Sequence, residues 1–109
     1  MSNAEASSRV SAAAIKSFMT DAFCACGLPA GDAEITAGAM LDADLSGSDA
    51  HGVFRLPAYV RNLKHGHINA HPDIRVVERS PATALVDGDN GMGHLVMTHV
   101  ANTAVEIAR

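Results

Sequence analysis

Apolar residues recur at three- and four-residue steps through the first part of the chain, and this spacing predicts amphipathic helices. The first predicted helix covers residues 11–26. Its apolar stripe consists of Ile15, Phe18, Met19, Ala22 and Phe23. Ser11 is suited to the N-cap, and Gly27 can adopt the positive φ that often ends a helix.

A second helix is predicted over residues 32–45, after a short turn at residues 28–31. Its buried face is expected to contain Ala33, Ala37, Met40 and Leu41. Asp32 and Glu34 fall in its first turn, where the helix dipole favours acidic side chains. Because the link to the first helix is short, the two helices should form an antiparallel hairpin.

A third helix is predicted to begin near residues 55–57 and to close at Gly66. Its apolar face consists of Leu56, Tyr59, Val60 and Leu63. Pro57 limits where this helix starts, since a proline inside a helix removes a hydrogen bond and clashes with the preceding turn.

The pattern then changes to two short runs rich in β-forming residues, 74–78 and 82–86, separated by Ser80-Pro81. This arrangement predicts a β-hairpin. A glycine-rich loop follows, and a fourth helix is predicted from about Leu95. One face of this helix is expected to carry Val96, Val100, Ala104 and Ile107. The predicted fold class is therefore α+β: three helices, a short hairpin and a further helix.

Composition narrows the classes of partner. The chain of 109 residues carries a formal charge of −4 and no long basic run, which argues against nucleic acid or an anionic membrane as a partner. Cys24 and Cys26 are the two cysteines, and at this spacing on a helix they cannot easily bridge each other. Without a disulfide framework, a signal peptide or a long apolar span, a cytoplasmic location is expected.

Three chemically useful side chains are spaced four residues apart: His51, Arg55 and Tyr59. If the segment is helical, they lie along one face. Reduction of a 2-oxo acid needs a proton donor near neutral pH, for which histidine is suited, and a planar guanidinium that grips the carboxylate. On spacing alone, an exposed arginine, a histidine at a helix start and a core tyrosine are the simpler interpretation.

Three stretches resemble one family of enzymes. Residues 43–59 (Ala-Asp-Leu-Ser-Gly-Ser-Asp-Ala-His-Gly-Val-Phe-Arg-Leu-Pro-Ala-Tyr) are similar to the Ala-Asp-Leu-x-Gly-x-x-Ser-His-Gly-Val-x-Arg-Leu-x-x-Tyr stretch of the type 2 malate/L-lactate dehydrogenases. Residues 62–69 resemble that family's Gly-x-Ile-Asn exit from its third helix, and residues 86–94 its Asp-Gly-x-x-Gly-x-Gly loop. The family also includes sulfolactate, ureidoglycolate and diketogulonate oxidoreductases.

The resemblance implies an NAD(P)H-dependent oxidoreductase that interconverts a small 2-oxo acid and a 2-hydroxy acid. His51 would be the catalytic proton donor, Arg55 would bind the substrate carboxylate, and Tyr59 would line the same pocket. Ala50 departs from the serine that the family often has before the histidine, which leaves the substrate open. The resemblance also implies a homodimer and a fold other than the Rossmann fold.

The resemblance further implies that most contacts to NAD or NADP lie beyond Arg109. Residues 11–109 are then expected to form the N-terminal, substrate-side portion of a longer enzyme, inactive alone, with residues 1–10 disordered or tag-like. The last predicted helix is still in period at Arg109, with no terminator.

Two other functions stay open at this stage. One is a helical assembly module that uses apolar faces to hold a partner chain. The other is a small metal-binding domain built on the loop histidines His65, His67 and His71, although no cysteine or carboxylate partner stands at ligand spacing. No metal site is assigned: loop 87–93 looks like an EF-hand loop but has Thr98 where the final glutamate ligand would stand.

Overall fold

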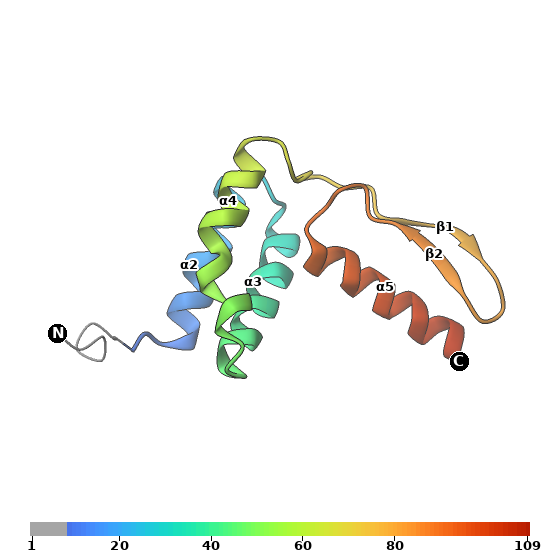
Figure 1. Cartoon of the computed structure of the whole chain (residues 1–109), viewed down its shortest axis with the longest axis horizontal. Helices are drawn as coiled ribbons and strands as arrows, with labels where there is room; N and C mark the ends of the chain where they lie inside the picture. The colour runs from blue at the N-terminus through green and yellow to red at the C-terminus, as the bar shows by residue number, and fades with distance from the viewer. Residues whose placement is uncertain (1–8) are drawn as a thin grey trace.

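The computed structural model describes residues 9–109, and the predicted tag-like segment 1–10 lies almost entirely outside this range. Helices α2 (Ala12–Ala25) and α3 (Ala30–Leu45) form the predicted antiparallel hairpin (Figure 1). Ser11 caps α2 as predicted, since its side-chain oxygen accepts a hydrogen bond from the N–H of Ala14 at 3.1 Å. Gly27 follows the helix with a φ of 101°.

Helix α3 begins two residues before its predicted start at Asp32. The reason is Pro29, whose φ of −56° suits a helix entry and whose carbonyl accepts a hydrogen bond from the N–H of Ala33 at 2.9 Å. After α3, two short 3-10 turns, η1 (Asp49–His51) and η2 (Val53–Arg55), reverse the chain.

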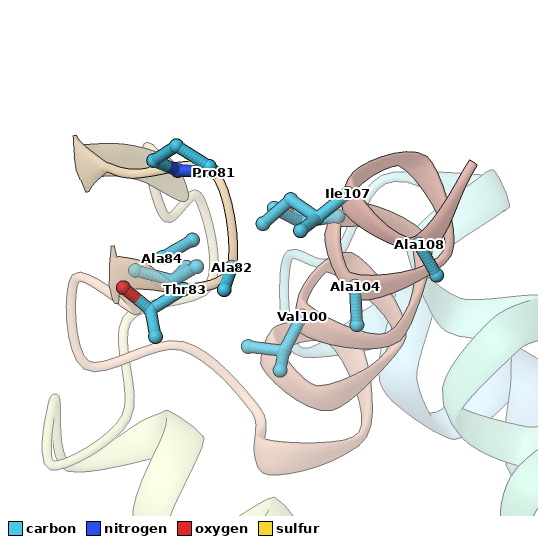
Figure 2. A pocket seen from close by; sticks show the side chains of 10 residues that line it. Pro81, Ala82, Thr83, Ala84, Val100, Ala104, Ile107 and Ala108 are labelled. Atoms are coloured by element: carbon cyan, nitrogen blue, oxygen red, sulfur yellow. The ribbon is translucent and has the colours of Figure 1, made fainter.

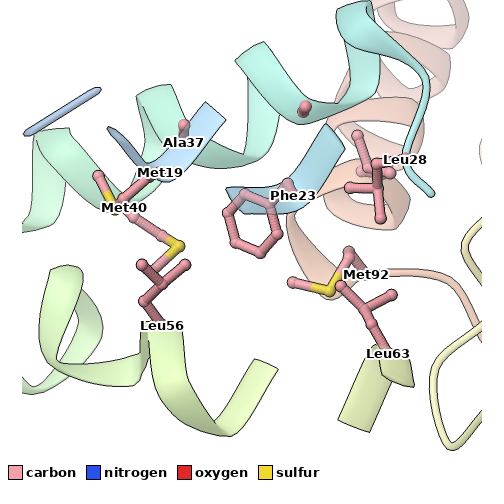
Figure 3. Close-up of a cluster of buried hydrophobic side chains, with 10 residues drawn as sticks. Met19, Phe23, Leu28, Ala37, Met40, Leu56, Leu63 and Met92 are labelled. Carbon is pink, nitrogen blue, oxygen red and sulfur yellow. The ribbon is translucent and has the colours of Figure 1, made fainter. Parts of the chain in front are cut away.

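Helix α4 (Leu56–Lys64) then packs against the helical hairpin of α2 and α3. Pro57 lies in its first turn, as predicted. The core lies among these three helices and the start of α5 (Gly93–Ala108) (Figure 3). Its buried apolar side chains are Met19, Phe23, Leu28, Ala33, Ala37, Met40, Leu56, Leu63, Met92 and Leu95.

Two parts of the predicted core are different in the structure. Phe18 was expected on the apolar stripe of α2, but it is 60% exposed, because the other members of that stripe pack against the core and Phe18 does not. Leu41 of α3 is half-buried rather than buried. The hydrophobic periodicity thus identified the buried sides of α2 and α3, with deviations at single positions.

The predicted hairpin is confirmed as strands β1 (Arg75–Arg79) and β2 (Ala84–Asp87), which pair antiparallel. The register shifts between Val76 and Glu78, so Val77 forms a bulge. Figure 1 shows that the hairpin and α5 extend away from the three-helix part of the molecule. Most hairpin side chains are exposed.

The buried residues of α5 are Leu95 and Thr103, which lie outside the apolar face predicted from the sequence. The predicted face instead meets the hairpin tip, where Val100, Ala104 and Ile107 line an apolar groove of about 420 Å3 (Figure 2). The β-hairpin covers this face of α5 only partly. The apolar stripe of α5 is therefore not fully buried, although its period is regular.

The glycine-rich loop before α5 is held by its own carboxylates. The Asp89 side chain accepts hydrogen bonds from the backbone N–H of Asp73 at 2.8 Å and from the side-chain amide of Asn69 at 3.1 Å. Asp87 accepts one from the N–H of Asp89 at 2.9 Å. Asp89 therefore joins two loops of the chain, and Asp87 stabilises the turn that contains Asp89.

Three observations bear on the classes considered above. Cys24 and Cys26 are both free thiols, the first exposed and the second half-buried. Within residues 9–109, no helix is both long enough and apolar enough to cross a membrane. No three histidine, cysteine or acidic side chains of that same range gather in a way that could hold a metal ion.

Candidate functional site

The turn that carries the predicted site is fixed to α3 by one carboxylate. Asp44 accepts a hydrogen bond from the backbone N–H of Val53 at 2.9 Å through its Oδ2 atom. Gly52 is buried against the same side chain, and a Cβ atom at this position would overlap the Asp44 carboxylate. The Asp-Leu and His-Gly-Val parts of the sequence motif therefore meet in space.

His51 occupies the end of η1, and its imidazole is exposed. Its backbone N–H donates to the carbonyl of Ser48 at 2.9 Å, which closes the turn. The helical alignment of His51, Arg55 and Tyr59 considered from their spacing does not form, because Gly52 separates two 3-10 turns and regular helix begins only at Leu56. The three residues lie in three successive elements.

Arg55 and Tyr59 are brought together by the first turn of α4. The guanidinium carbon of Arg55 lies 5.6 Å from the centre of the Tyr59 ring. At this separation the positive group is attracted by the electron-rich face of the ring. Arg55 is exposed, so its guanidinium remains available to a carboxylate.

A residue that the sequence did not single out for this site, His94, also contacts Tyr59. The two rings meet edge to face, with centroids 5.6 Å apart and an interplanar angle of 87°. His94 lies in the first turn of α5, far from Tyr59 along the chain. The one signal in the sequence was its position directly after the glycine-rich loop, at the start of a helix.

The environment of His94 is unusual for a histidine. The side chain is half-buried, and its Nδ1 atom is closed off from solvent with no hydrogen-bond partner among the described residues. Burial lowers the pKa of His94 below its ordinary value, because desolvation disfavours the charged form. The imidazole is therefore neutral at pH 7.

Tyr59 and His94 line one open cavity of about 580 Å3. Its wall is mainly apolar and is formed by Ala39, Tyr59, Ile68, Met92, Gly93, His94, Met97, Thr98 and Ala101. Neither His51 nor Arg55 is part of this wall, although Arg55 contacts the wall residue Tyr59. An apolar hollow with a few polar groups is typical of a small-molecule site.

The described residues do not form a phosphate site for a dinucleotide. The cavity wall contains no lysine or arginine. Asp87, the last residue of β2, and Asp89 of the glycine-rich loop hold their carboxylates in hydrogen bonds with neighbouring groups of the chain.

Comparison with known proteins identifies the family. The profile of the malate/L-lactate dehydrogenase family matches residues 10–109, and the chain belongs to this family. It is 47% identical over 83 residues to the L-sulfolactate dehydrogenase of Methanocaldococcus jannaschii, covering 76% of this chain and 24% of that protein. It is 40% identical over 93 residues to the malate dehydrogenase of Pyrococcus horikoshii, covering 85% and 26%.

Solved structures agree on the fold. The structure of malate dehydrogenase from Pyrococcus horikoshii OT3 matches with a TM-score of 0.89 at 39% identity, covering 93% of this chain and 29% of that one. Sulfolactate dehydrogenase from Methanocaldococcus jannaschii matches with a TM-score of 0.88 at 41% identity, covering 91% and 29%. The match thus covers only 24–29% of the length of these relatives.

Proposed function

We propose that this chain forms the substrate side of an NAD(P)H-dependent oxidoreductase that interconverts a small 2-oxo acid and the corresponding 2-hydroxy acid. The observation that carries the proposal is the pairing of Arg55 with Tyr59 at the cavity, in a chain of the malate/L-lactate dehydrogenase family. A guanidinium held beside an apolar hollow is suited to an organic carboxylate.

In this proposal Arg55 binds the carboxylate of the substrate through paired hydrogen bonds. The planar guanidinium matches the two carboxylate oxygens, which lysine cannot do with the same geometry. Stacking on Tyr59 limits the orientations that the arginine side chain can adopt. Tyr59 in turn forms part of the cavity wall beside the bound acid.

His51 supplies the proton in the reducing direction. When the carbonyl carbon accepts hydride, its oxygen gains negative charge and must be protonated, and an imidazole can deliver that proton near neutral pH. The turn held by Asp44 and Gly52 fixes the backbone around His51. In the reverse direction the same imidazole accepts the proton of the hydroxyl group.

A reduced nicotinamide, when bound, supplies the hydride. The cofactor, NAD or NADP, is proposed to bind mainly outside these residues, since they offer no phosphate site. Among the relatives, one from Chromohalobacter salexigens is named (2R)-3-sulfolactate dehydrogenase (NADP(+)), and it is 33% identical over 85 residues. A homodimer in the cytoplasm completes the proposal.

The proposal is tested by assaying the complete product of the gene that encodes these residues. Oxaloacetate, 3-sulfopyruvate and pyruvate are each supplied with NADH and with NADPH, and loss of absorbance at 340 nm is followed. The 109-residue chain alone, assayed in parallel, should show no turnover. If the complete product reduces none of these acids with either nicotinamide, the proposal is wrong.

One observation favours assembly as a second function. The apolar groove between the hairpin tip and α5 is open, and Ile107 lies on its wall. Such a surface is suited to covering by another chain segment. Sedimentation of the chain across a range of concentrations tests this: a concentration-dependent dimer that Ile107→Asp abolishes would support it, and a monomer throughout would contradict it.

A further inference from the structure

His94 is a polar residue that the proposed chemistry leaves unused, although it lies on the wall of the same cavity as Tyr59. It reaches Tyr59 from a different element, α5, and meets the tyrosine edge to face at 5.6 Å. Arg55 contacts the same tyrosine ring, also at 5.6 Å. Arg55 and His94 therefore both contact the tyrosine that forms part of the cavity wall.

The two nitrogens of His94 have different environments. Nδ1 is closed off from solvent and has no partner among the described residues, so it cannot serve a ligand in the open cavity. Nε2 is then the ring nitrogen left to contact one. A neutral imidazole carries one proton, and the proton is favoured on the nitrogen that can find an acceptor. The neutral imidazole of His94 therefore carries its hydrogen on Nε2.

The start of α5 adds to this preference. Gly93 and His94 are the first two residues of the helix, and both line the cavity. A helix N-terminus carries partial positive charge, which disfavours an imidazolium and favours an anionic ligand. The side chain of the cap residue, Met92, makes no capping hydrogen bond. An anion placed beside His94 therefore meets a neutral donor and the positive end of a helix.

We propose that His94 is a specificity residue, which donates a hydrogen bond from Nε2 to a second anionic group on the substrate. This inference rests on the proposed function, in which Arg55 holds the carboxylate next to the reacting carbonyl. The second group, a carboxylate or a sulfonate at the far end of the acid, lies at His94 and the start of α5. Such a site prefers a 2-oxo acid with two anionic groups over one with a single carboxylate.

Kinetics of the complete gene product test the inference with His94→Leu, which removes the donor, and His94→Gln, which keeps an N–H donor. The His94→Leu change should raise KM for oxaloacetate roughly 10- to 100-fold, as expected for a lost hydrogen bond to a charged group, and KM for pyruvate by less than about 3-fold. His94→Gln should keep most of the preference for oxaloacetate, and KM for the nicotinamide should not change.

His99→Leu is the matched control, because His99 lies on the same helix but lines a different hollow. It should leave the ratio of the two KM values unchanged. An equal change for oxaloacetate and pyruvate in His94→Leu, or no change for either, would overturn the inference. A wild-type enzyme that reduces neither acid would instead remove the proposed function, so the two failures are distinct.

A second measurement does not depend on turnover or on the folding of a variant. Long-range proton–nitrogen correlation spectra of the 109-residue wild-type chain report the tautomer of each histidine. A neutral His94 with its proton on Nε2 at pH 7 supports the inference. A charged His94, or one with its proton on Nδ1, overturns it.

Discussion

The Asp44 carboxylate and the α-carbon of Gly52 share one crowded contact, and this contact fixes the turn that carries His51. Asp44 accepts a hydrogen bond from the N–H of Val53 and fills the space that a side chain at position 52 would need. The φ of Gly52, −95°, is open to any residue. Glycine is therefore required here by space and not by backbone conformation.

Replacing Gly52 with alanine should destabilise the chain by about 2 kcal/mol, because the half-buried Asp44 carboxylate has to move and loses its hydrogen bond. Asp44→Ala alone should cost about 1 kcal/mol. The double variant should cost clearly less than the two single changes together, since the overlap is gone once Asp44 is truncated. Urea unfolding of the four proteins measures this, and strictly additive losses would contradict the contact.

Local signals in the sequence were sufficient for the elements of the fold. Ser11 and Gly27 marked the ends of α2 correctly, because capping and positive φ depend on a few neighbouring residues. Phe18 was placed wrongly, since which part of an apolar stripe is buried depends on how helices far apart in sequence pack.

The candidate site was predictable only in part, for the same reason. The motif identified Arg55 and Tyr59, which are close in sequence and contact each other in the structure. His94 reaches the site from α5, so its contact with Tyr59 depends on the tertiary fold. The roles of His51 and Arg55 stay predictions, and the next two experiments test them.

Arg55→Ala in the complete gene product should raise KM for the 2-oxo acid and lower kcat/KM by about 2–3 kcal/mol, as expected for loss of a charged hydrogen bond. Arg55→Lys should recover only part of this, because an ammonium cannot pair with both carboxylate oxygens. Arg61→Ala is the control: Arg61 is exposed on the same helix, α4. Unchanged steady-state kinetics in Arg55→Ala would remove Arg55 from the site.

His51→Ala should lower kcat by about 100-fold or more, the usual contribution of a general acid, while KM for the acid changes little. The matched control is His65→Ala, an exposed histidine after the end of α4. Stopped-flow measurement of nicotinamide oxidation at pH 7 separates the chemical step from product release. A rate close to wild type would show that another group delivers the proton.

Asp89→Ala should lower the free energy of unfolding by about 1 kcal/mol, since it leaves the N–H of Asp73 without its acceptor, while the amide of Asn69 keeps only the backbone carbonyl of residue 89. Asp89→Asn should cost less, because one amide oxygen remains to accept. The change should also loosen the loop before α5, which hydrogen–deuterium exchange of the neighbouring backbone amides reports. Equal stability of the alanine and asparagine variants would argue against this network.

The pH dependence of stability should report the buried state of His94. Burial lowers the pKa of His94 in the folded chain, so the unfolded chain binds a proton more readily there. Between the ordinary pKa of histidine and the lower folded value, stability falls as the pH falls, because protonation favours the unfolded state. Urea unfolding at pH 7.5 and at pH 5.5 should show a larger loss of unfolding free energy for wild type than for His94→Gln, which cannot titrate.

Tyr59 contacts His94, and Arg55 contacts that tyrosine. Both residues are present in the two proteins, so their effects cancel in the comparison. Equal losses in the two proteins would mean that folding does not change the pKa of His94.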